Sequence, residues 1–97
     1  MAELQNKVVF LSDKKTSIRL AVAEWDAVDN ICARENIKRN DLIETINRRK
    51  DPTIGLTCSV RLFTIIYFYQ LLVYKQQNYA SNAKLENPIF EAINGIL

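Results

Sequence analysis

The chain contains no histidine, only two glycines, two prolines and two cysteines among its 97 residues. The absence of histidine removes the commonest general base and the commonest metal ligand. No Gly-rich phosphate loop is present, and no pair of carboxylates lies on an apolar face. We therefore expect no catalytic residues, no metal site, no cofactor and no enzymatic activity.

The two cysteines, Cys32 and Cys58, do not form a C-x-x-C pair, so the sequence indicates neither a zinc site nor a redox dithiol. The first residues do not have the pattern of a signal peptide. We therefore expect both cysteines to be buried free thiols in a reducing cytoplasm. The most apolar stretch, Leu62 to Tyr74, lies between two cations and is shorter than the roughly 20 residues that span a bilayer. It predicts a buried helix and no membrane segment, and the expected location is cytoplasmic.

The first half of the chain carries most of the charge and begins with a strand pattern. Thr16, Ile18 and Leu20 alternate with polar residues, which predicts a strand with one apolar and one polar face. Upstream, residues 8–11 form a short apolar run that could be a strand, and we assign residues 1–13 to an N-terminal arm.

Helical periodicity follows. An apolar stripe through Trp25, Val28 and Ile31 predicts a helix from about Ala23 that ends near Asn36. Asn40 or Asp41 could cap a second helix, which ends at residues 47–50. A third helix, from residue 57 or 59 to about 76, is apolar on nearly every side, so it needs cover that one small chain supplies poorly. Residues 77–97 form a tail with a short amphipathic helix after Asn87-Pro88.

A single strand in a helical chain has unpaired edges, and a second copy of the same strand would satisfy one of them. The run KKTSIRLAVAEWDAVDNICARENIKRNDLIETI, residues 14–46, resembles the ribbon-helix-helix family of DNA-binding proteins. The continuation LTCSVRLFTIIYF resembles a bacterial variant with a third helix. The resemblance implies a mainly α fold with one short N-terminal strand. It also implies an intertwined homodimer with an antiparallel two-stranded ribbon between chains, with residues 14–76 as the domain.

The resemblance also implies a function and a site. We expect sequence-specific binding of double-stranded DNA in the major groove by a transcriptional repressor or autoregulator. The expected base contacts are Lys15, Ser17 and Arg19, on the polar face of the strand. The expected phosphate contacts, at the ribbon end and at the start of the second helix, are Lys14, Lys38, Arg39 and Asn40.

Two other functions remain open from the sequence. The first is an antitoxin-type protein whose C-terminal tail binds a partner protein through Ile89, Phe90 and Ile93. The second is a protein-interaction module with no role in nucleic-acid binding, in which the polar face of the strand is simply solvated. Assembly beyond the dimer is also open.

Overall fold

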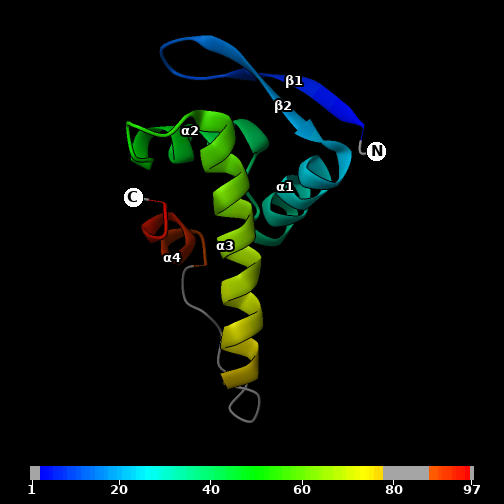
Figure 1. Cartoon of the computed structure of the whole chain (residues 1–97), viewed down its shortest axis with the longest axis vertical. Coiled ribbons are helices and arrows are strands. Elements are labelled where there is room, and N and C mark those ends of the chain that lie inside the picture. Colours follow the sequence, from blue (N-terminus) through cyan, green and yellow to red (C-terminus); the bar gives the residue numbers. More distant parts are fainter. Residues whose placement is uncertain (1–2, 78–87, 97) are drawn as a thin grey trace.

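The computed structural model describes residues 3–77 and 88–96, which form a two-stranded sheet above a group of helices (Figure 1). In chain order the elements are β1 (Leu4–Phe10), β2 (Lys15–Ala21), α1 (Val22–Glu35), α2 (Arg39–Arg49), α3 (Leu56–Gln77) and α4 (Pro88–Asn94). The mainly helical fold with an N-terminal sheet confirms the fold class. The polar segment at residues 78–87 lies outside the described residues.

The predicted strand is β2, and its alternation is confirmed. Ile18 and Leu20 are buried at 1% and 0% exposure, while Ser17 and Arg19, which alternate with them, are exposed. β2 pairs with β1 in antiparallel register, from Leu4 opposite Ala21 to Phe10 opposite Lys15. β1 therefore begins well before the apolar run at residues 8–11 that suggested a strand.

The strand pairing differs from the expected one. A single strand with unpaired edges was expected, but β1 of the same chain pairs with β2. The hairpin closes where the Leu11 N–H donates to the Lys14 carbonyl at 2.8 Å. Any pairing of β2 with a second copy must therefore use the edge of β2 that faces away from β1.

The ends of the first two helices show which capping predictions held. α1 ends at Asn36, whose φ of 54° places it in the left-handed region, as predicted. α2 begins earlier than predicted, because Lys38 and not Asn40 or Asp41 is its N-cap residue. The prediction was wrong because the Asn40 side chain is used elsewhere: its Oδ1 accepts a hydrogen bond from the Phe10 N–H at 3.4 Å.

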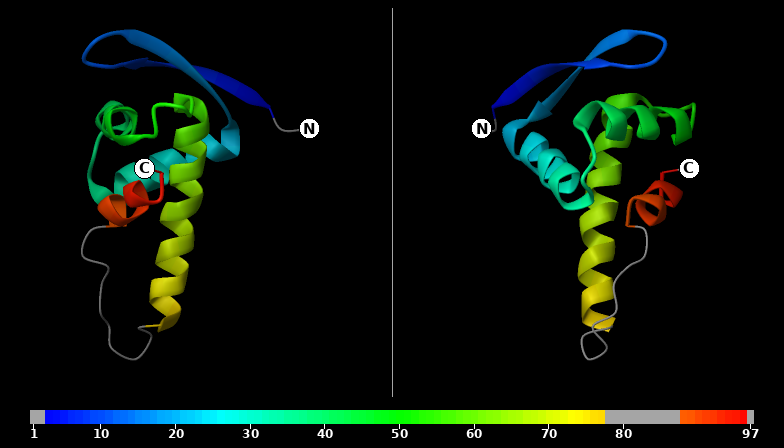
Figure 2. Two further views of the ribbon diagram at one scale, coloured as in Figure 1. Left: turned by 60° about the vertical axis from the view of Figure 1, so that its left-hand side comes forward. Right: turned by 180° about the vertical axis from the view of Figure 1, so that it is seen from behind.

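α3 is the central helix, and the other helices pack around its first half (Figure 2). Its buried side, formed by Val60, Phe63 and Tyr67, completes the core with residues of β2, α1 and α2. Residues 56–73 of α3 have a mean hydropathy of 1.5 and are long and apolar enough to cross a membrane, by length and composition only. This segment is longer than the apolar stretch from Leu62 to Tyr74 on which the expectation of no membrane segment was based. Only 28% of this segment is buried, and Phe63 and Tyr67, each 0% exposed, lie on its buried side.

The hairpin tip is held to α2 by Glu44. Its carboxylate accepts hydrogen bonds from the Ser12 hydroxyl at 2.7 Å and from the Ser12 N–H at 2.9 Å. These bonds, with a smaller contribution from Arg48, hold the pKa of Glu44 below its usual range. The carboxylate therefore fixes the position of the hairpin over α2.

This pKa shift predicts a pH-dependent contribution of Glu44 to stability. A carboxyl whose pKa is lowered by folding stabilises the protein above its unfolded pKa, near 4.5, and loses that effect as the pH falls further. The variant Glu44→Gln should thus melt below wild type at pH 7, and the gap should close in acid. Thermal unfolding from pH 7 to pH 2.5 measures this difference. A gap that is independent of pH would contradict the assignment.

Candidate nucleic-acid interface

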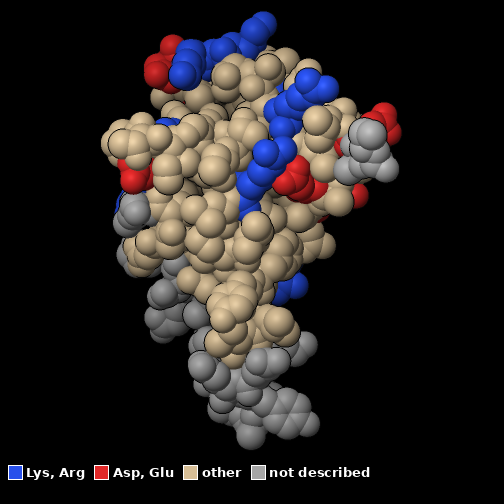
Figure 3. Space-filling view, viewed as in Figure 1, with Lys and Arg blue, Asp and Glu red and all other residues tan. Residues whose placement is uncertain are grey.

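The side of the hairpin that faces away from the helices, here called the outer face, carries the predicted base contacts. Lys15, Ser17 and Arg19 are all exposed on it, opposite the buried side chains of β2. Figure 3 shows basic side chains over the hairpin at the top of the molecule. The structure thus brings these three residues together on one accessible surface.

β1 contributes to the same outer face, which the sequence analysis missed. The register places Asn6 opposite Arg19, Val8 opposite Ser17, and Phe10 opposite Lys15. Val8 is 53% exposed and Phe10 is 62% exposed, so apolar side chains adjoin the basic ones. A signal was available: two strand-like runs lie on either side of Ser12-Asp13, a spacing typical of a β-hairpin.

α2 lies beside the end of β1 and the hairpin turn, where Asn40 and Glu44 accept hydrogen bonds from Phe10 and Ser12. The sheet has two strands, so no strand of the described chain lies along the other edge of β2.

The backbone groups on this free edge follow from the hydrogen bonds at the hairpin ends. The N–H groups of Leu11 and Val22 donate across the hairpin, to Lys14 and Glu3. Because N–H direction alternates along an antiparallel pair, the N–H and C=O groups of Lys15, Ser17 and Arg19 point away from β1. Lys15, Ser17 and Arg19 therefore have both their side chains on the outer face and their backbone N–H and C=O groups on the free edge of β2.

The predicted phosphate contacts lie in two places. Lys14 is exposed at the hairpin turn, and Lys38 is exposed at the start of α2, where no side chain caps the helix. The exposed Asn40 follows two residues after Lys38 and accepts a hydrogen bond from the end of β1. The start of α2 and the hairpin therefore form one continuous region.

Arg39 differs from the other predicted phosphate contacts, because an acidic side chain already pairs with it. Its guanidinium makes a bidentate ion pair with Asp29 of α1, in which Nε donates to Oδ1 at 3.0 Å and Nη2 donates to Oδ2 at 2.8 Å. The guanidinium also lies over the Trp25 ring, at 5.3 Å from the centroid. The charge of Asp29 offsets that of Arg39, and the contact connects α2 to α1.

Cys32 and Tyr67 have raised pKa values. Burial, and then the charge of Asp29, raises the pKa of the Cys32 thiol. Burial, together with a hydrogen bond to Glu35, raises the pKa of Tyr67 to about 12. Within residues 3–77 and 88–96, no three His, Cys, Asp or Glu side chains are grouped closely enough to hold a metal ion.

The tail residues predicted to bind a partner protein lie on or near α4. Ile93 is 4% exposed and Ile89 packs against the core, so both contact their own chain. The side chain of Phe90 lies outside the described part of the structure. A partner would reach Ile93 only if α4 left the core.

A strand with a polar outer face, followed by two helices that hold it from below, is the arrangement of a ribbon-helix-helix DNA-binding module. A family model described as a ribbon-helix-helix domain matches residues 4–68. The chain belongs to this family, whose members are in general dimeric DNA-binding regulators and typically not enzymes. No curated protein and no solved structure matched the chain.

Proposed function

We propose that the protein binds double-stranded DNA sequence-specifically in the major groove, as a repressor or autoregulator of transcription in a bacterial cytoplasm. The observation that supports this proposal is the exposure of Lys15, Ser17 and Arg19 on the outer face, while Ile18 and Leu20 anchor the same strand in the core. Arginine and lysine donate well to guanine acceptors, and serine forms a shorter hydrogen bond to a base edge.

The active form in this proposal is a homodimer in which the free edges of two β2 strands pair antiparallel. A two-stranded ribbon fits the major groove, which is about 12 Å wide. The flanking β1 strands would then lie about 14 Å apart, from a spacing of about 4.8 Å between strands. They are therefore placed at the groove rims, where Asn6 faces the sugar–phosphate backbone and β2 faces the bases.

Phosphate contacts fix the ribbon in the groove. The free N–H groups at the start of α2 provide an anion site, and Lys38 and Asn40 flank it. Lys14 extends the contact from the hairpin turn. Arg39 contributes least, because its guanidinium is held by Asp29, and its main role is to set the position of α2.

Selection of fragments from random DNA, followed by a salt titration on the enriched sequence, tests the proposal. We expect one enriched sequence with two symmetric half-sites, and an affinity that falls steeply as salt rises. Each phosphate contact contributes a slope of about −0.9 in log affinity against log salt. The absence of binding to any fragment at low salt would eliminate the proposal and favour a protein-interaction module.

A further inference from the structure

The exposed side chains of α3 form a single stripe that is mostly apolar. Within residues 56–73, every exposed side chain lies on this stripe, which consists of Cys58, Arg61, Ile65, Tyr69 and Leu72. Ile65 and Tyr69 are each 66% exposed, and Leu72 is 57% exposed. The solvent face of an amphipathic helix normally carries charged residues. Here the only charged residue of the stripe, Arg61, is paired with Glu24.

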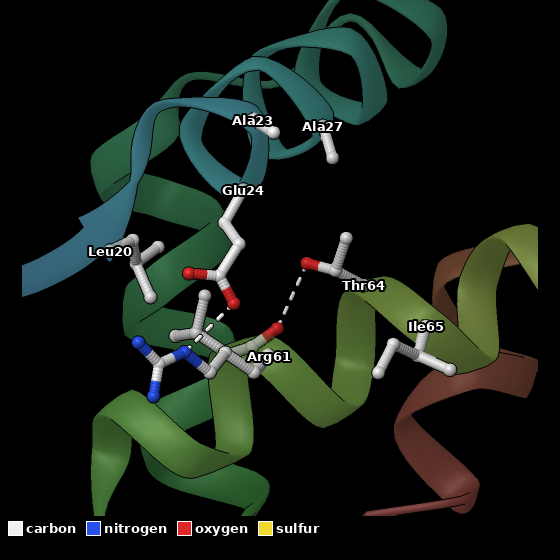
Figure 4. Close-up of a pocket in the computed structure, with 8 residues that line it drawn as sticks. Leu20, Ala23, Glu24, Ala27, Arg61, Thr64 and Ile65 are labelled. Atoms are coloured by element: carbon white, nitrogen blue, oxygen red, sulfur yellow. Dashed lines mark hydrogen bonds and ion pairs between the residues drawn. The ribbon is translucent and has the colours of Figure 1, made fainter. Parts of the chain in front are cut away.

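An apolar groove of about 180 Å³ lies beside the upper end of the stripe, between α1 and α3 (Figure 4). Its α1 wall carries Ala23 and Ala27, whose small side chains leave the space open. Ile65 and Thr64 form part of the α3 wall, and Leu20 of β2 closes one end. The groove and the stripe are therefore one continuous apolar surface that includes Ile65.

This surface adjoins the free edge of β2. The Ala21 N–H, which points away from β1, donates to the Glu24 carboxylate at 2.8 Å. The other oxygen of that carboxylate accepts from Arg61 at 2.8 Å, and both side chains line the groove. A chain that pairs with the free edge of β2 is thereby brought against α3.

Symmetry determines how that chain meets the stripe. Two antiparallel β2 strands are related by a two-fold axis perpendicular to their sheet. α3 begins below the sheet and runs away from it, roughly along that direction (Figures 1 and 2). The two α3 helices would lie side by side and parallel about this axis. Residues 58, 65 and 72, spaced at intervals of seven, would face their counterparts, as at a coiled-coil seam.

We propose that the stripe of α3 is the docking surface for a second copy of this chain, with the two α3 helices packed in parallel. The proposal rests on the pairing of β2 edges proposed above. It adds a specific interface to that dimer, and it accounts for an apolar surface that the single chain leaves exposed.

Sedimentation of the full chain without DNA tests the interface. We expect wild type to be dimeric, and the Ile65→Glu variant to dissociate at least tenfold more readily while keeping its helical circular dichroism. Val8→Glu is the matched control, because Val8 is similarly exposed but lies on the outer face of the hairpin. An Ile65→Glu, Leu72→Glu double variant that dimerises like wild type would overturn the proposal. So would wild type that binds to phospholipid vesicles as a monomer.

Disulfide cross-linking tests the parallel orientation. A Leu72→Cys substitution in a Cys58→Ser chain should give a covalent dimer on mild oxidation, since a parallel pair places residue 72 beside its counterpart. Asp26→Cys, on the exposed side of α1, should give little. Cys32 stays in place, because its raised pKa keeps the thiol protonated. Equal cross-linking at the two positions would contradict the parallel pair.

The two proposals can fail separately. An Ile65→Glu variant that remains dimeric and still binds the selected DNA would refute the α3 interface and leave the DNA-binding proposal intact. If the Leu72→Cys, Cys58→Ser variant cross-links as expected but wild type binds no DNA fragment, the proposed function alone is refuted.

Discussion

Replacing Arg19 with alanine will weaken binding to the selected DNA site by about 1–3 kcal/mol for each Arg19 that contacts a base. The side chain is exposed on the outer face, and its backbone lies on the free edge of β2. Because the side chain is not buried, the substitution removes the proposed base contact without opening a cavity. We expect the free energy of unfolding to change by no more than about 0.5 kcal/mol. Fluorescence anisotropy on selected and scrambled sites measures the loss.

The matched control is Arg49→Ala, which removes an exposed arginine from the far end of α2. It should lower the affinity for both DNA sites to a similar small extent and leave their ratio unchanged. Arg19→Ala should instead bring the two affinities closer together. If Arg19→Ala unfolds the protein, or weakens both sites equally, Arg19 does not contact bases.

The local elements could be predicted because each depends on a short pattern. Period-two alternation over residues 16–20 was enough to assign β2 and its two faces, and Asn36 marked the end of α1. The apolar stripe through Trp25, Val28 and Ile31 identified the buried side of α1. In each case the determining contacts lie within a few residues of one another.

The parts that could not be predicted depend on contacts between distant residues. Asn40 was expected to cap α2, but it bonds to Phe10, thirty positions away. Arg39 was expected to be free for phosphate, but Asp29 lies within reach only once α1 and α2 pack together. The sequence of the third helix is apolar on nearly every side, so it does not indicate which side is buried. Packing against the other elements covers one side of α3 and leaves the stripe that includes Ile65 exposed.

Replacing Trp25 with alanine should lower the free energy of unfolding by about 3–5 kcal/mol. Trp25 is 2% exposed, and two cations lie over its ring, Lys7 at 5.7 Å and Arg39 at 5.3 Å from the centroid. Its indole N–H donates to the carbonyl of Gln5 at 3.0 Å, so the side chain connects β1, α1 and α2. For a small domain this loss is a large part of the total stability. Urea denaturation followed by far-ultraviolet circular dichroism measures it.

Trp25→Phe separates packing from the hydrogen bond. Phenylalanine keeps an aromatic face for Lys7 and Arg39 but cannot donate to Gln5, so the loss should fall to about 1–2 kcal/mol. The remaining loss should be concentrated at β1, because Gln5 belongs to that strand. Relative to wild type, hydrogen exchange in the variant should then accelerate more in β1 than in α1. Equal losses for the two variants would show that the bond to Gln5, and not the packing of the ring, holds the hairpin on the helices.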